Sequence, residues 1–104
     1  MIVTICQFGL PESFTPERTR SVFRESTGKF EKMPGLIRKY FLLAEDGRSA
    51  ASVYLWEDRA PAEEFFTEAW KDFMVGKYGH RPTVTYYECP VVVDNHTGEV
   101  IRVS

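Results

Sequence analysis

Blocks of alternating and helically spaced apolar residues divide the chain into strands and helices. Residues 1–8 are rich in β-branched side chains and are followed by Gly9 and Pro11, which predicts a strand. A helix is expected to begin at residues 15–17, where Thr, Pro and Glu supply an N-cap oxygen, a proline at the first helical position and a carboxylate near the positive end of the helix dipole. Its apolar residues recur every three or four positions until Pro34-Gly35 ends it.

The second half of the chain repeats this order. Strands are expected over 36–44 and 50–57, joined by a turn of Asp-Gly type. A second helix is expected between Asp58, its N-cap, and the glycines at positions 76 and 79. A fourth strand is expected over 83–93.

Strand, helix and strand therefore occur twice in succession, which is the ferredoxin-like βαββαβ order. Right-handed crossovers would place the first and third strands at the centre of a four-stranded antiparallel sheet with both helices on one face. We expect an α+β fold in which residues 1–93 form one domain. Residues 94–104 are expected to form a C-terminal arm, because they are more apolar than a disordered tail.

Both faces of the predicted sheet carry apolar or aromatic side chains. In the third strand, Ala51, Val53 and Leu55 alternate with Ser52, Tyr54 and Trp56. Two helices can cover only one face, and several hundred Å² of exposed aromatic surface is abnormal for a monomer. We therefore expect a homodimer with the sheets face to face, a dimeric α+β barrel, with the arm reaching across to the partner. Alternation assigns Tyr40, Tyr54 and Tyr86 to the partner-facing side.

Composition narrows the possible partners. The net charge of −2 and the scattered Lys and Arg residues argue against nucleic acid. No apolar run approaches the roughly 20 residues of a membrane span, and the first residues do not read as a signal peptide, so a cytoplasmic protein is expected. Cys6 and Cys89 form no CxxC motif and are expected to be reduced, free thiols without a metal.

The segment AASVYLWEDRAPAEEFF, residues 50–66, and the Pro34-Gly35-Leu36 step before the second strand resemble the YdhR-type monooxygenases of the dimeric α+β barrel superfamily. The similarity covers most of residues 1–93. It implies a pocket in each subunit between the sheet and the helices. Related antibiotic-biosynthesis monooxygenases oxidise polycyclic phenols with O2 and without flavin, metal or haem. Many of them carry a histidine in the second helix, where this chain has Trp70 instead.

Six residues are candidates for a site. The aromatic side chains of Trp56, Phe66, Trp70 and Tyr86 could bind and stack an aromatic substrate, although buried indoles and tyrosines are also ordinary core and interface residues. His80 could take or hold a proton, and Arg81 could stabilise developing negative charge. The same pair could instead cap the end of the second helix.

These observations lead to one main hypothesis and two alternatives. The main one is a cofactor-independent monooxygenase that oxidises a small aromatic or polycyclic phenolic substrate with O2. The first alternative is a non-catalytic dimeric barrel that binds a small apolar ligand. The second is a haem-binding member of the same superfamily, with His80 as the axial ligand.

Overall fold

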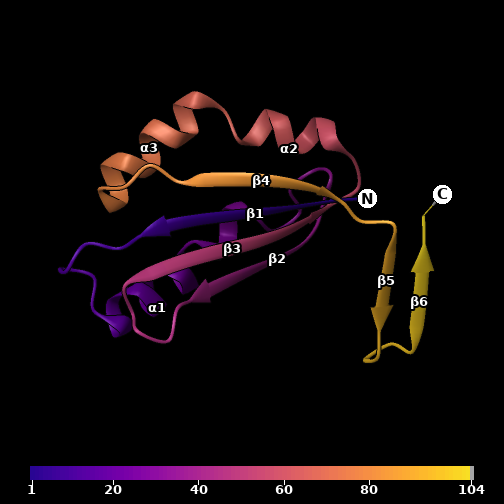
Figure 1. Ribbon diagram of the computed structural model, residues 1–104, viewed down its shortest axis with the longest axis horizontal. Coiled ribbons are helices and arrows are strands. Elements are labelled where there is room, and N and C mark those ends of the chain that lie inside the picture. Colours follow the sequence, from indigo (N-terminus) through magenta and orange to yellow (C-terminus); the bar gives the residue numbers. More distant parts are fainter. Residues whose placement is uncertain (104) are drawn as a thin grey trace.

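The computed structural model describes residues 1–103 and contains a four-stranded antiparallel sheet (Figure 1). The strands are β1 (Ile2–Gly9), β2 (Leu36–Leu43), β3 (Ser49–Trp56) and β4 (Thr83–Glu88). Their order in the sheet is β2-β3-β1-β4, so the predicted central position of the first and third strands is confirmed. The helices pack on one face of this sheet, as expected for the ferredoxin-like α+β class.

The first helix is shorter than the sequence predicts. Helix α1 (Pro16–Glu25) begins as expected, because Thr15 Oγ1 accepts a hydrogen bond from the Arg18 N–H at 3.2 Å. It ends ten residues before Gly35 and is followed by the short 3-10 helix η1 (Thr27–Lys29). The Ser26 N–H is shared between the Val22 and Phe23 carbonyls, at 3.0 and 3.1 Å, and the second of these bonds has the 3-10 spacing that η1 continues. The Ser26 hydroxyl also donates to the Val22 carbonyl at 2.7 Å. The expectation of one continuous helix is therefore wrong over its last turns.

The second predicted helix is two helices, α2 (Arg59–Phe65) and α3 (Glu68–Tyr78). Thr67 has an extended backbone between them, and its Oγ1 accepts from the Trp70 N–H at 3.1 Å, which makes it the N-cap of α3. The prediction missed this cap, although Thr67 followed by Glu68 is a helix-start signal. Gly79 ends α3 in the left-handed conformation with a φ of 76°.

The helix-facing side of the sheet holds most of the core, and it includes two tyrosines that we assigned to the other side. Tyr54 is 2% exposed and packs against Phe65 and Phe66 of α2, with ring centroids 5.8 and 5.0 Å away. Tyr86 also faces α2, 6.3 Å from Phe66. Alternation fixes which residues share a face, but it does not say which face meets the helices. Of the three tyrosines only Tyr40, which is 48% exposed, lies on the open face.

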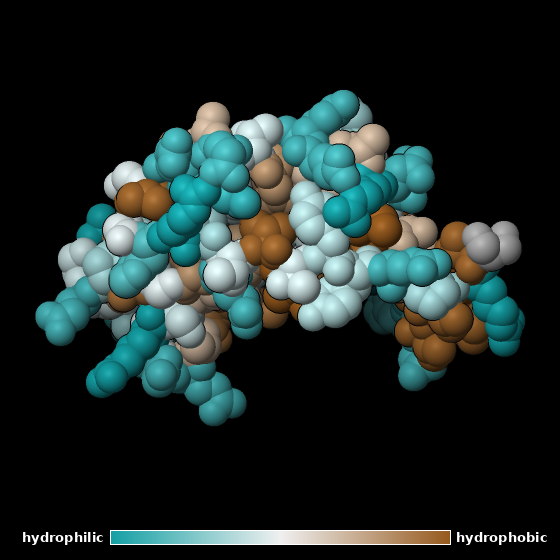
Figure 2. All heavy atoms as spheres, turned by 45° about the horizontal axis from the view of Figure 1, so that its top comes forward, coloured by the Kyte–Doolittle hydropathy of each residue, from teal (hydrophilic) through white to brown (hydrophobic). Residues whose placement is uncertain are grey.

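The chain after β4 forms a separate hairpin made of β5 (Val91–Asp94) and β6 (Glu99–Arg102). The predicted strand over 83–93 is wrong at its end, because pairing with β1 stops at Glu88 and Pro90 has no N–H to donate. Figure 1 shows the hairpin set apart from the main sheet, and Figure 2 shows apolar side chains gathered on it.

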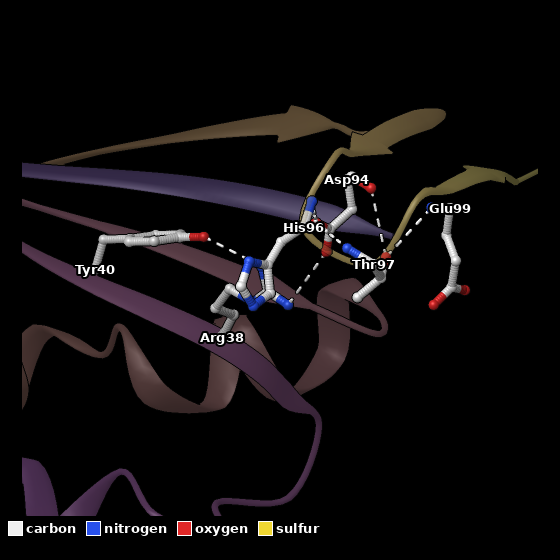
Figure 3. A network of polar contacts seen from close by, with 6 residues as sticks. All are labelled: Arg38, Tyr40, Asp94, His96, Thr97 and Glu99. Atoms are coloured by element: carbon white, nitrogen blue, oxygen red, sulfur yellow. Dashed lines mark hydrogen bonds and ion pairs between the residues drawn. The ribbon is translucent and has the colours of Figure 1, made fainter.

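A polar network links the turn end of this hairpin to the sheet (Figure 3). Arg38 of β2 donates to the Tyr40 hydroxyl at 3.3 Å, and its guanidinium lies 3.8 Å from the Asp94 carboxylate. Asp94 also accepts from the backbone N–H groups of His96 and Thr97, at 2.9 and 3.3 Å. His96 thus lies in the hairpin turn, where the sequence placed it.

Candidate functional site

A narrow cavity between the sheet and the helices, here called the lysine cavity, is the candidate site. Strands β1, β2 and β3 form its floor, and α1, η1 and α3 form its roof. The residues that line it are mainly aromatic or basic: Cys6, Phe8, Phe23, Ser26, Lys29, Phe30, Lys39, Phe41, Ser52, Tyr54, Trp70, Phe73, Met74, Lys77 and Tyr78. Its free volume is about 30 Å³, which is room for one water molecule.

Lys39 projects into this cavity because of the alternation of β2. An extra residue at Ile37 interrupts the pairing of β2 with β3, and beyond it Lys39 and Phe41 share the helix-facing side. The Lys39 ammonium is surrounded by aromatic rings, with centroids 3.4 Å away for Phe30, 4.0 Å for Phe41 and 4.6 Å for Tyr54. Such rings attract a cation through their quadrupoles. Lys39 is therefore held in an aromatic cage made by the protein itself.

The charge of Lys39 is nevertheless disfavoured in this environment. Burial, with a smaller contribution from Lys29, lowers the pKa of Lys39 from 10.5 to about 7. Burial and Lys29 also lower the pKa of Lys77. The lining contains no Asp or Glu, and among residues 1–103 none of these three ammonium groups forms an ion pair. The lining thus concentrates basic groups without a carboxylate among them, although Glu25, outside the lining, partly opposes the lowering of the Lys77 pKa.

The other titratable groups of the cavity are neutral at physiological pH. Burial raises the pKa of the Cys6 thiol to about 11 and raises the pKa of the Tyr54 and Tyr78 hydroxyls. A thiol with such a pKa is a poor nucleophile, because the thiolate is the reactive form. These groups can contribute hydrogen bonds but no negative charge.

Flexible side chains close the mouth of the cavity. Phe73 of α3 is 54% exposed although it lines the cavity, and the Lys29 ammonium lies 5.6 Å from the centre of its ring. Lysine side chains have many rotamers, and an exposed phenylalanine is free to turn. A ligand larger than water would require Lys29, Phe73 and Lys77 to swing outward.

The four predicted aromatic site residues lie in one cluster, but only Trp70 lines the lysine cavity. Phe66 packs behind it, with ring centroids 5.0 Å apart, and links it to Trp56 at 6.0 Å and Tyr86 at 6.3 Å. Trp56 is 0% exposed, and its indole N–H donates to Thr4 Oγ1 at 3.0 Å. The structure therefore places Trp70 at the cavity and the other three residues behind it as support.

His80 and Arg81 lie elsewhere, in an open groove at one end of the sheet. The other lining residues of this groove are Gln7, Phe8, Gly9, Leu42, Leu43, Ala44, Ser49, Ala50, Ala51 and Thr83. A Cβ atom at position 9 would lie 3.3 Å from the imidazole of His80, so Gly9 makes room for that ring. Arg81 forms ion pairs with Glu68 and, at 3.4 Å, with Asp72. The structure does not bring this pair together with the tryptophans, and its role stays a prediction.

The sequence reasoning missed the lysines. A usable signal was Lys39 itself, a charged residue with the same parity as Phe41 and Leu43 in the largely apolar segment LIRKYFLLA. A lysine on the buried parity of a strand is rare unless it is paired or functional. The contributions of Lys29 and Lys77 could not be found this way, because both lie on helices whose orientation toward Lys39 depends on the tertiary fold.

Residues 1–103 contain no metal-binding cluster, no disulfide and no membrane-spanning helix. No group of three or more His, Cys, Asp or Glu residues in this part of the chain could hold a metal ion. Both cysteines are free thiols, with Cys6 buried on β1 and Cys89 partly exposed after β4. None of the described helices is long and apolar enough to cross a membrane.

Comparison with known proteins adds to this geometry. No family model and no curated protein matches the chain. Among solved structures it is similar to an antibiotic biosynthesis monooxygenase, with a TM-score of 0.64, 17% identity, and coverage of 86% of this chain and 98% of that one. It is also similar to SnoaB, a cofactor-independent oxygenase from Streptomyces nogalater, with a TM-score of 0.62, 15% identity, and coverage of 85% and 91%. A third similar structure is that of Rv0793 from Mycobacterium tuberculosis, with a TM-score of 0.60, 13% identity, and coverage of 86% of this chain and 95% of that one. The chain therefore has the ferredoxin-like α+β fold, which it shares with these structures.

Proposed function

We propose that this protein is a cofactor-independent monooxygenase of the YdhR type, which oxidises a small aromatic or polycyclic phenolic substrate with O2 in the lysine cavity. The observation that carries the proposal is the position of this aromatic, basic cavity between the sheet and the helices, in a fold shared with a cofactor-independent oxygenase. Fold alone does not determine activity, so the proposal depends on the cavity.

The lining residues suit an electron-rich, planar substrate. Phe30, Phe41 and Trp70 offer aromatic surfaces for the rings of the substrate. The enclosed position between sheet and helices limits access of water, which strengthens electrostatic interactions with a substrate anion and protects reactive intermediates. The substrate itself would supply the electrons that reduce O2.

Oxygen uptake by metal-free and flavin-free protein tests the proposal. We expect protein-dependent uptake with a panel of naphthol- and anthrone-like phenols. Uptake should fall in Trp70→Ala, which removes a wall of the cavity. His80→Ala tests the sequence-based role of the histidine, and His96→Ala, in the exposed hairpin turn, is its matched control. Uptake that is unchanged in Trp70→Ala would contradict the location of the site.

One observation favours the second candidate function, a non-catalytic barrel that binds a small apolar ligand. No histidine lines the lysine cavity, so the cavity lacks the group that most often transfers protons near neutral pH. Saturable binding of 1-naphthol without oxygen uptake would favour this alternative. Haem binding through His80 is the weaker candidate, because its groove is open rather than enclosing. The absence of a Soret band after haem titration would dismiss it.

We also propose that the protein acts as a homodimer. The open face of the sheet and the hairpin expose large apolar residues: Tyr40, Leu42, Tyr87, Val91, Val93, Val100, Ile101 and Val103. A second copy with its own open face would cover the sheet, and the hairpin arm would reach the partner. Light scattering at micromolar concentration should give about twice the 12.0 kDa of the chain. A mass of one chain would contradict the dimer.

A further inference from the structure

We infer that the lysine cavity is an anion-binding site for an aromatic carboxylate or phenolate, and that binding of this anion places a proton on Lys39. The inference rests on the proposed function for the position of the site, but it does not depend on oxygenation. What the two ligand types share is a planar apolar body that carries one anionic oxygen.

The first argument is the charge of the cavity. Lys29 from η1, Lys39 from β2 and Lys77 from α3 converge on one space that has no carboxylate in its lining. The other titratable groups that face Lys39 are Cys6 on β1, Tyr54 on β3 and Tyr78 on α3, and burial keeps all three neutral at pH 7. Like charges held close together destabilise a fold unless an opposite charge joins them. An anionic ligand supplies that charge.

The second argument is the state of Lys39. Burial and the nearby lysines favour the uncharged amine, whereas the surrounding rings and a bound anion favour the ammonium. When a phenol binds, its O–H bond breaks and the proton moves to the Lys39 Nζ, which leaves a phenolate paired with an ammonium. When a carboxylate binds, the proton comes from the solvent. The same amine can therefore accept either ligand as an anion.

The aromatic residues define the rest of the ligand. Phe30, Phe41 and Tyr54 surround the Lys39 ammonium, and Trp70 and Phe73 continue the aromatic lining. An inorganic anion would contact the lysines but would gain nothing from these rings. A fused aromatic anion would contact both the lysines and the rings.

Isothermal titration calorimetry with 2-naphthoate at pH 8 tests the inference. Titrations in two buffers of different ionisation enthalpy give the number of protons taken up. With a free-state pKa of about 7 for Lys39, wild-type protein should take up about 0.9 proton per ligand. The Lys39→Met variant should bind roughly 10- to 100-fold more weakly, because a charge-assisted hydrogen bond is lost, and should take up almost no proton.

Two further variants separate charge from structure. Lys39→Arg keeps a permanent positive charge, so it should retain binding but lose the proton uptake. Lys32→Met removes a positive charge from an exposed residue outside the lysine cavity and should behave like wild type. A single cooperative unfolding transition for each variant, well above the titration temperature, shows that the comparison concerns folded protein.

Three results would overturn the inference. They are the absence of 2-naphthoate binding to wild type, equal affinity for the neutral analogue 2-naphthalenemethanol, and unchanged proton uptake in Lys39→Met. A failure of the proposed function can be told apart from these three results. Anion binding with proton uptake but without oxygen consumption would contradict oxygenation alone, and oxygen consumption by a protein that gives any of those three results would contradict the inference alone.

Discussion

Replacing Lys39 by Met should stabilise the protein, and the gain should depend on pH. The substitution keeps an unbranched side chain of similar length in the lysine cavity and removes its charge. Lowering the pKa of Lys39 from 10.5 to about 7 corresponds to about 5 kcal/mol of unfavourable free energy for the charged form in the fold. Aromatic rings around the ammonium offset about 1–2 kcal/mol of this. Several kcal/mol therefore remain to be relieved at low pH.

The sign of the pH dependence follows from the direction of this pKa change. Below pH 7 both the folded and the unfolded chain carry the proton, and the full penalty is present. Between pH 7 and 10.5 the unfolded chain binds more protons than the folded one, so stability rises with pH. This group should therefore make the wild type more stable at pH 8.5 than at pH 6 by about 1–2 kcal/mol. That window avoids ionisation of Cys6, whose pKa burial raises to about 11.

Urea denaturation at constant ionic strength measures both effects. The free energy of unfolding of Lys39→Met should exceed that of wild type most at pH 6, and the difference should shrink by about 1–2 kcal/mol at pH 8.5. Lys32→Met, at an exposed position outside the lysine cavity, is the matched control and should change stability by less than about 0.5 kcal/mol. A Lys39→Met variant that is less stable than wild type at pH 6, or that keeps the wild-type pH slope, would refute the reasoning.

Three further predictions concern the core, the thiols and the mouth of the cavity. Thr4→Val removes the acceptor of the buried Trp56 N–H and should lower the free energy of unfolding by about 1–3 kcal/mol. Thr85→Val, on the exposed side of β4, is the control and should change this free energy little. Equal effects of the two substitutions in urea denaturation would contradict the prediction. In native protein a thiol reagent should label the partly exposed Cys89 before the buried Cys6. Mass spectrometry of the digested protein measures the order of labelling, and labelling of Cys6 first would contradict the prediction. Phe73→Ala should speed 1-naphthol association measured by stopped-flow fluorescence, because Phe73 closes the mouth; an unchanged rate would exclude that role.

The sequence predicted the fold well where local signals agree with the tertiary structure. The β-branched run of β1, the cap at Thr15 and the Asp-Gly turn before β3 each act within a few residues, and each lies where expected. The boundaries failed where a single polar side chain ends an apolar pattern. Ser26 and Thr67 use their hydroxyls on the backbone, and the helical spacing of the neighbouring apolar residues hides both events.

The site was less predictable because it depends on which face of the sheet meets the helices. The sequence proposed Trp70 as a substrate-binding residue; Trp70 lines the lysine cavity, and its role stays a prediction. The sequence also grouped His80 with the tryptophans as a residue beside the predicted cavity mouth. In the structure His80 follows Gly79, the C-cap of α3, and lines the open groove at one end of the sheet. The convergence of Lys29, Lys39 and Lys77 from three elements has no signature in spacing along the chain.

The most direct test of the account is a crystal structure of the protein with bound 1-naphthol. We expect density for the fused rings in the lysine cavity, against Trp70 and Phe73, with the ligand oxygen within hydrogen-bonding distance, about 3 Å, of the Lys39 Nζ. It also predicts that Phe73 and Lys29 have moved outward. Density in the groove of His80 and Arg81 instead, with the lysine cavity still closed, would contradict the account.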